Sequence, residues 1–324
     1  MPNRVTQLAS RQRAEVIRID EQALDIVART YLALYDNLRG DVDALMLAIE
    51  RMDAPTIAAV KRLPQYVRLT RRAQSELEDF TIYLERTIDT VALSSIGLGL
   101  DHSRELVRSM TRVRFDGLQP SAMRPLLGYL AKDGPLYERL SLLTGSTVDK
   151  VISTIADGVS LGYNPRKIAS QIQDSFGGGL TDALRNTRTV QLYSYRDSAR
   201  ANYMATGGIV TGWIWYAELD TDTCLSCVAQ HGSEHDLSET LNDHYNGRCA
   251  ALPLIEEFGN PVETSGEDWF NSLSESEQRA MMGESKHAAW SAGKFEFSRL
   301  SAEQDNEVYG VMRTEASLAS LIGE

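Results

Sequence analysis

Residues 213–227 read WIWYAELDTDTCLSC, and this stretch decides the fold class. From Trp213 to Leu219, large apolar side chains occupy both alternating faces, a pattern typical of a strand in the middle of a small sheet. The strand leads directly into two cysteines, Cys224 and Cys227. Helical periodicity dominates the chain before it. We therefore predict an α+β fold, with a mostly helical N-terminal region followed by a small α+β domain that holds a short sheet and a Cys/His knuckle of the zinc type.

The three cysteines of the chain fall in one segment. Cys224 and Cys227 form a C-x2-C pair, and after sixteen residues His244 and Cys249 form an H-x4-C pair. A C-x2-C turn brings two thiolates together, and a second pair from a distant loop can complete a tetrahedron around Zn²⁺. Four protein ligands leave no position for a catalytic water, so the predicted zinc is structural. Two other interpretations stay open: a metal-free knuckle of reduced thiols, and a redox-active dithiol.

His231 lies between the two pairs, and we expect it to pack on the knuckle or to serve as an alternative ligand. Residues 231–235 formally match H-x-x-E-H, the inverted zinc-protease motif, but that motif requires a helix. Gly232 and Ser233 are poor helix formers, so a protease is disfavoured. The sequence has no G-x-S-x-G elbow, P-loop or dinucleotide fingerprint. We predict that the protein is not an enzyme, and a hydrolase is the weakest alternative.

The N-terminal part of the sequence has a helical period. After Pro64, apolar side chains recur every three or four residues along one face of a long helix. They are Leu69, Ala73, Leu77, Phe80, Leu84, Ile88 and Val91. Gly97 and Gly99 are expected to break this pattern, and Gly177–Gly179 to end a later helix as a flexible connection or a functional hinge.

Arg188 lies within an apolar stripe of a helix expected over about residues 181–205. A buried arginine requires an acidic partner. The turn before the knuckle carries Asp220 and Asp222. We therefore predict an ion pair of Arg188 with Asp220 or Asp222 that ties the helix to the knuckle. A solvent-exposed Arg188 is the alternative.

Composition limits the class of protein. The chain has 324 residues, ordinary apolar and charged fractions and a net charge of −12, which excludes a general nucleic-acid coater. Three clustered cysteines are not a secreted disulfide framework. No apolar run is long enough for a membrane span, and the N-terminus carries no signal-peptide core, so a cytoplasmic location and no membrane partner are expected.

We expect three parts along the chain. Residues 1–161 form a helical arm or docking region, and residues 162–254 form the α+β domain with the knuckle. Residues 255–324 form a helical tail with 14 acidic and 5 basic side chains. The tail either binds a basic partner or keeps the protein soluble.

The segment from about Gly162 to Leu254 resembles the phage minor head, or head morphogenesis, proteins named after protein F of phage Mu. The ordered motifs that carry the resemblance are Gly162–Arg166, Arg188-Thr189, Trp213–Leu219, Leu219–Cys227, His231-Gly232 and His244–Cys249. Parts of the tail between 266 and 294 are similar to tails of some of these proteins. Three positions depart from the family pattern: Val190 replaces an acidic residue, Tyr245 a proline and Gly247 a cysteine.

The resemblance implies a virion protein in few copies, associated with the portal vertex and supporting head assembly, DNA packaging or ejection. It implies a location in the virion head, and in the host cytoplasm during assembly. The implied partner is the portal protein, with major capsid and scaffolding proteins as further candidates. Phage DNA is a candidate partner of the N-terminal arm through Arg68, Arg71 and Arg72, or Arg104, Arg108, Arg112 and Arg114. The alternative function is a zinc-knuckle nucleic-acid-binding protein.

Overall fold

The computed structural model describes residues 4–111, 113, 115 and 117–323, which fold into two compact units. The helical unit comprises Asp20–Val91 and Leu130–Arg188. The sheet unit comprises the described residues of Met1–Ile19, Ala92–Tyr129 and Thr189–Glu324. These units differ from the expected ranges 1–161, 162–254 and 255–324, because three long helices each contribute residues to both units.

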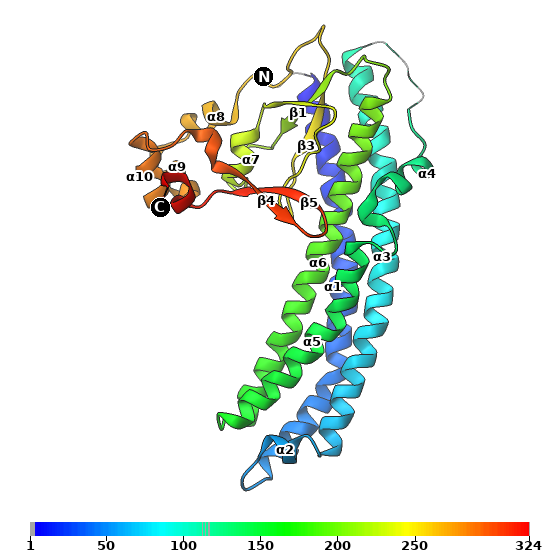
Figure 1. The fold of residues 1–324 in the computed structure, drawn as a ribbon, viewed down its shortest axis with the longest axis vertical. Coiled ribbons are helices and arrows are strands. Elements are labelled where there is room, and N and C mark those ends of the chain that lie inside the picture. The colour runs from blue at the N-terminus through cyan, green and yellow to red at the C-terminus, as the bar shows by residue number, and fades with distance from the viewer. Residues whose placement is uncertain (1–3, 112, 114, 116, 324) are drawn as a thin grey trace. The chain divides into compact units, whose positions relative to one another are not determined.

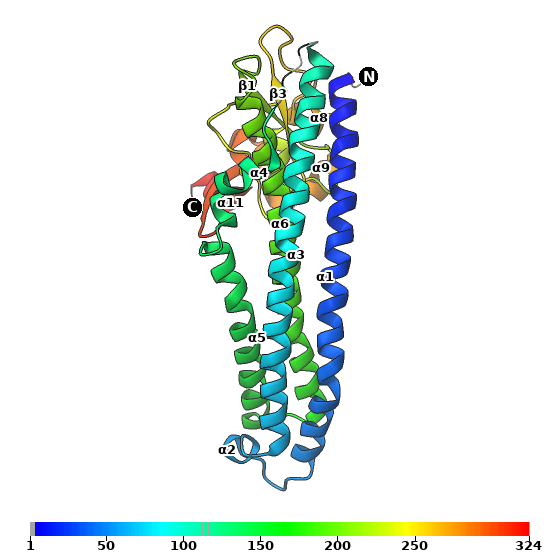
Figure 2. The ribbon, with the colours of Figure 1, turned by 90° about the vertical axis from the view of Figure 1, so that its right-hand side faces the viewer.

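The helical unit is built from segments of four long helices, which lie side by side in Figures 1 and 2. They are α1 (Arg4–Glu50), α3 (Pro64–Met110), α5 (Pro135–Ser160) and α6 (Pro165–Met204), with the short α2 (Ile57–Val60) between α1 and α3. The predicted apolar face of residues 69–91 is confirmed, since each of its seven side chains is buried. Tyr31 of α1 and Phe80 of α3 meet edge to face in this core.

The prediction that glycines break or end two of the long helices is wrong. Helix α3 continues through Gly97 and Gly99, and α6 continues through Gly177–Gly179. A Cβ atom at Gly179 would lie 2.3 Å from Tyr31 Oη, and one at Gly99 would lie 2.2 Å from the carbonyl oxygen of Tyr195. Gly99 and Gly179 therefore allow close contact with the neighbouring helix, a function that local propensity does not reveal.

We expect Gly99→Ala to destabilise the sheet unit by about 1–3 kcal/mol, because the methyl group would meet the Tyr195 carbonyl oxygen and push α3 from α6. Gly97→Ala is the matched control, since nothing lies within 4 Å of its Cβ position. The control should gain up to about 1 kcal/mol from helix propensity. Urea unfolding of both variants measures the difference, and equal stabilisation by both would contradict the prediction.

The sheet unit contains the predicted short sheet, and its central strand is the one expected. Strand β1 (Gly212–Tyr216) pairs antiparallel with β2 (Glu234–Asp236) on one side and β3 (Ala250–Leu254) on the other. Trp213 and Trp215 pack on one face, in a cluster that includes Tyr203 of α6. Ile214 packs on the other face with Leu106 of α3. Burial on both faces explains why β1 is apolar throughout.

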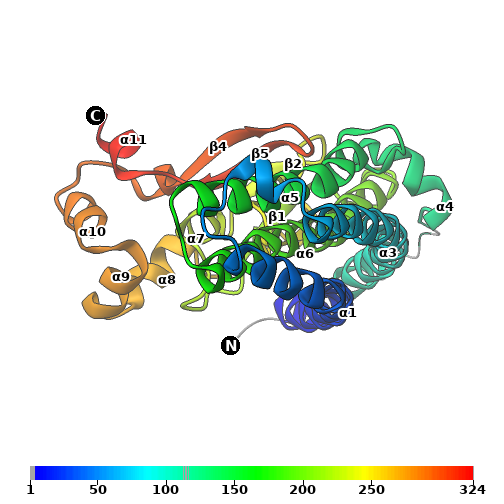
Figure 3. The same cartoon turned by 90° about the horizontal axis from the view of Figure 1, so that it is seen from below.

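The C-terminal region is only partly helical, which corrects the expectation of a helical tail. Its hairpin consists of β4 (Ser301–Asn306) and β5 (Gly310–Glu315). Its α-helices, labelled in Figure 3, are α8 (Gly266–Ser272), α9 (Glu275–Met282), α10 (Glu284–Ser291) and α11 (Leu318–Ile322). A 3-10 helix spans Phe297–Leu300. Phe270 and Trp290 pack in one hydrophobic cluster with Leu225 and Val228 of α7 (Leu225–Gln230). The tail therefore belongs to the core of the sheet unit.

The remaining elements are short: α4 (Pro120–Met123) and the 3-10 helices Arg124–Leu126 and Gly128–Leu130. The predicted α+β class, with helices first and a short sheet late in the chain, is confirmed. Among the described residues, no helix combines the length and the apolar character needed to cross a membrane.

Candidate metal centre

The turn after β1 positions the first two candidate ligands. Asp220 Oδ1 accepts hydrogen bonds from Asp222 N at 3.1 Å and Thr223 Oγ1 at 2.7 Å, which fixes the turn. Cys224 is the N-cap of α7, and its Sγ accepts a hydrogen bond from Cys227 N at 3.4 Å. The C-x2-C spacing therefore places both thiols at the start of one helix.

The second pair comes from the loop between β2 and β3, here called the closing loop (residues 241–249). Asn246 adopts a positive φ of 62° in this loop, and Cys249 immediately precedes β3. Cys227 and Cys249 are both buried in the hydrophobic cluster of the two tryptophans of β1. The closing loop thus returns the chain to the sheet beside the knuckle.

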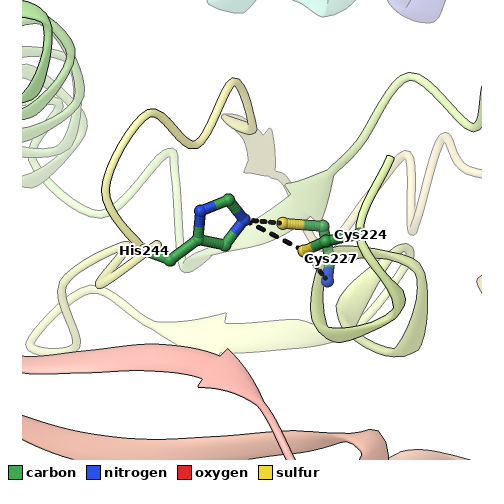
Figure 4. A group of neighbouring side chains, drawn as sticks. All are labelled: Cys224, Cys227 and His244. Atoms are coloured by element: carbon green, nitrogen blue, oxygen red, sulfur yellow. Dashed lines mark hydrogen bonds between the residues drawn. The ribbon is translucent and has the colours of Figure 1, made fainter. Parts of the chain in front are cut away.

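The structure brings the predicted ligands together. Cys224 Sγ lies 2.9 Å from His244 Nε2, and Cys227 Sγ lies 3.4 Å from the same nitrogen, as Figure 4 shows. Among the described residues, there are two groups in which all donor atoms lie within 4.8 Å of one another. The first group is Cys224, Cys227 and His244, and the second is Cys227, Asp243 and Cys249. Cys227 belongs to both groups. The cluster is therefore close enough to bind a metal ion.

Hydrogen bonds prepare His244 as a ligand. Its Nδ1 lies 2.7 Å from the carbonyl oxygen of Tyr245, a partner that requires a proton on Nδ1. That hydrogen bond leaves Nε2 facing the thiols, which is the orientation of a metal-binding histidine. Although burial opposes protonation, the hydrogen bond with Cys224 and the charge of Asp243 raise the pKa of His244 to about 10.

The two thiols of the knuckle differ in acidity. The hydrogen bond from Cys227 lowers the pKa of Cys224 to about 5, with help from His244 and against the effect of burial. The hydrogen bonds with Cys224 and Cys249, together with burial, raise the pKa of Cys227. Of these two thiols, Cys224 is therefore the one more easily deprotonated for metal binding.

Two further residues of this site, Arg196 and Asp243, were not predicted from the sequence. Arg196 of α6 and Asp243 form an ion pair at 3.1 Å, and their side chains are only 2% and 1% exposed. Arg196 also donates to the carbonyl oxygens of Gly247 at 2.6 Å and Cys249 at 2.8 Å. One buried guanidinium therefore holds the closing loop at three points. The only signal in the sequence is an arginine among the apolar residues of α6, and Arg188 carries the same signal.

Gly247 is packed against the Asp243 carboxylate. A Cβ atom at position 247 would lie 2.1 Å from Asp243 Cγ and Oδ2. The carboxylate thus fills the space that a side chain at 247 would need.

The predicted pair of Arg188 with Asp220 or Asp222 is wrong. Arg188 binds Asp20 of α1 at 2.5 Å inside the helical unit. Burial raises the pKa of Asp20, and Arg188 opposes this shift. Asp220 lies 3.6 Å from Arg248, and Asp222 is exposed. The carboxylate that pairs with Arg188 thus lies on the neighbouring helix. A partly buried guanidinium pairs with the carboxylate that helix packing places next to it.

His231 is outside the metal-binding groups of the described residues. Its Nδ1 accepts a hydrogen bond from Ala217 N at 3.0 Å, and the side chain is 7% exposed. It is the C-cap residue of α7, and its hydrogen bond joins the end of this helix to the residue that follows β1. The H-x-x-E-H segment forms β2 and the turn before it, which does not match the helix that the protease motif requires.

Stability of the sheet unit should fall as the pH is lowered, because burial lowers the pKa of His231 to about 4. In the unfolded chain the His231 imidazole is protonated below about pH 6.5, whereas in the folded chain it is protonated only below about pH 4. The contribution is present above pH 6.5 and is lost as the pH falls, by about 3 kcal/mol in total. His231→Asn keeps an acceptor without a titratable group. Urea unfolding in the presence of EDTA at about pH 7 and about pH 4.5 measures the loss in free energy of unfolding for each protein. A loss as large in the variant as in the wild type would contradict this prediction.

The arginines proposed for DNA contact are engaged in part with acidic neighbours. Arg68 and Arg72 each lie 2.6 Å from Asp41, and Arg104 lies 2.6 Å from Asp101. Arg112 and Arg114 lie outside the described residues. This pairing reduces the positive charge that the arm offers to phosphates.

The C-terminal hairpin touches the closing loop next to the cluster. Asn306 Nδ2 donates to Tyr245 Oη at 2.6 Å, and Arg313 N donates to the Asn242 carbonyl oxygen at 2.6 Å. The ring of Tyr309 packs against those of Tyr193 and Tyr245. The candidate metal centre is therefore connected to the last strands of the chain.

No protein-family model matches this chain, and no curated protein or solved structure is significantly similar to it. The candidate metal centre, a cluster of thiols and imidazole close enough to bind a metal ion, lies beside the sheet, α6, α7 and the C-terminal hairpin.

Proposed function

We propose that this chain is a minor head protein of a tailed phage, a structural and interaction protein of the portal vertex that supports head assembly, DNA packaging or ejection. The observation that carries the proposal is the ordered set of motifs between residues 162 and 254, which ends in a partly buried Cys/His cluster. A closed cluster of this kind stabilises a fold and leaves no position for a catalytic water. The protein therefore acts by binding other virion proteins and not by catalysis.

We further propose that the cluster holds one structural Zn²⁺ ion. Thiolates and imidazole are the ligands that zinc prefers in proteins. Cys224, Cys227 and His244 supply three donors, and Cys249 is the fourth that the sequence predicts. The ion would join α7 to the closing loop, and so fix the surface that these elements present to a partner.

The proposed partner is the portal protein, with the major capsid and scaffolding proteins as further candidates. The last 70 residues carry most of the net negative charge of the chain, with 14 acidic and 5 basic side chains. They would suit a basic face of such a partner. Contact of the N-terminal arm with phage DNA is the less favoured interaction, because several of its arginines already bind carboxylates.

Quantitative mass spectrometry of purified virions tests this function. We expect a fixed ratio to the portal protein of about one copy per portal subunit or fewer, as for a component of a single vertex. Major capsid protein from the same particles is the internal standard. Absence of the chain from virions, with abundant chain in infected cells, would contradict the proposal and favour an assembly factor or an enzyme.

A further inference from the structure

We propose that Asp243, and not Cys249, supplies the fourth metal-binding atom of the cluster; this inference rests on the zinc site proposed above. Asp243 Oδ1 lies 3.2 Å from Cys227 Sγ and 3.5 Å from His244 Nε2, and those two atoms are 3.4 Å apart. Donors bound tetrahedrally to one zinc ion at bond lengths of about 2.0–2.3 Å are separated by about 3.3–3.8 Å. The three atoms therefore already have the spacing of three corners of one coordination shell.

Cys224 completes this set. Its Sγ lies 2.9 Å from His244 Nε2, so it borders the same triangle of atoms. Among the described residues, neither Asp243 nor Cys249 joins the group of Cys224, Cys227 and His244, and both lie with Cys227 in the second group. Asp243 differs from Cys249 in that its Oδ1 also lies 3.5 Å from His244 Nε2.

Hydrogen bonds orient the Asp243 carboxylate for this role. Its Oδ2 accepts from Arg196 Nη2 at 3.1 Å and from Cys249 N at 3.3 Å, which holds this oxygen away from the cluster. Its Oδ1 accepts from His244 N at 2.9 Å and faces Cys227 Sγ. Metal-binding carboxylates are commonly fixed in this way by donors on their other side.

The balance of charge also favours Asp243. Zn²⁺ with two thiolates, one carboxylate and a neutral imidazole carries one net negative charge, which the buried guanidinium of Arg196 neutralises. With Cys249 as the ligand, three thiolates and the adjacent Asp243 would leave one buried negative charge without a partner. Uncompensated buried charge is strongly unfavourable, so the count of charges favours the carboxylate of Asp243 over a third thiolate.

Gly247 makes room for this arrangement. A Cβ atom there would lie 2.1 Å from the carboxylate of Asp243. The backbone at 247 does not have a positive φ, so a side chain is excluded by the carboxylate and not by the conformation. A donor at position 247 and a donor at position 243 would therefore compete for the same space.

The first test counts thiolates in the whole 324-residue protein loaded with Co²⁺ in place of zinc, through the intensity of the thiolate-to-cobalt charge-transfer band. Wild type and Cys249→Ser should give equal intensities and zinc affinities within about threefold. Asp243→Asn should bind zinc at least about tenfold more weakly. An intensity in Cys249→Ser of about two thirds that of the wild type would show three thiolates and overturn the assignment.

A ligand swap separates a ligand from a residue that only positions the loop. Asp243→Ala should lose zinc, and adding Gly247→Cys to it should restore binding and give a third thiolate in the cobalt spectrum. If Asp243 only positions the loop, the added cysteine would not restore zinc binding. A wild-type protein that takes up no zinc would overturn the zinc proposal itself, whereas one that binds zinc through three thiolates would overturn only the role of Asp243.

Discussion

Replacing Arg196 with methionine is expected to lower the free energy of unfolding of the sheet unit by about 3–5 kcal/mol. The substitution leaves the Asp243 carboxylate buried without its counter-charge. It also removes the donors to the carbonyl oxygens of Gly247 and Cys249, which hold the closing loop to α6. Burial of an uncompensated charge costs far more than the loss of an exposed pair.

Urea unfolding with the metal removed measures this effect without a contribution from zinc. Arg248→Met is the matched control, because it also removes an arginine that contacts an aspartate, at 3.6 Å, but with a side chain that is 36% exposed. The control should change stability by less than about 0.5 kcal/mol. Arg196→Lys keeps the charge but cannot make all three contacts, so an intermediate loss is expected. A loss below about 1 kcal/mol for Arg196→Met would be inconsistent with a tightly paired buried site.

Removing zinc with EDTA is expected to lower the stability of the same unit by at least about 4 kcal/mol, if free zinc was present at about a thousand times its Kd. The physical reason is that an ion held by α7 and the closing loop binds the folded chain and not the unfolded one. Cys227→Ser removes the one thiol shared by both groups of donors. That variant should be unstable at the outset and insensitive to EDTA.

Thermal unfolding with and without EDTA, together with the zinc content of the purified protein, measures this effect. Hydrogen exchange gives a second readout, because β4 and β5 contact the closing loop through Asn306 and Arg313. Their amides should lose protection when zinc is removed. Equal melting temperatures and a protein free of zinc would contradict the prediction.

Several features followed from the sequence because they depend on local pattern. The apolar residues on both faces of β1 predicted a central strand, and the structure confirms it. The seven-residue stripe after Pro64 predicted the buried face of α3, because a helix of 3.6 residues per turn aligns such residues whatever they pack against. The spacing of Cys224, Cys227 and His244 predicted a cluster that the fold does assemble.

Other features were decided only by tertiary structure. Which arginine of α6 meets which acid depends on the neighbouring elements: Arg188 meets Asp20, and Arg196 meets Asp243, 47 residues away in the sequence. Glycine is required at position 99, inside a helix, because the backbone of Tyr195 occupies the place of a side chain there. The central strand, the buried helical face after Pro64 and the cysteine knuckle could be predicted, since periodicity and spacing are local. The partners of charged and glycine residues were set by packing, because the cost of an unpaired buried charge or a steric clash exists only when distant segments meet.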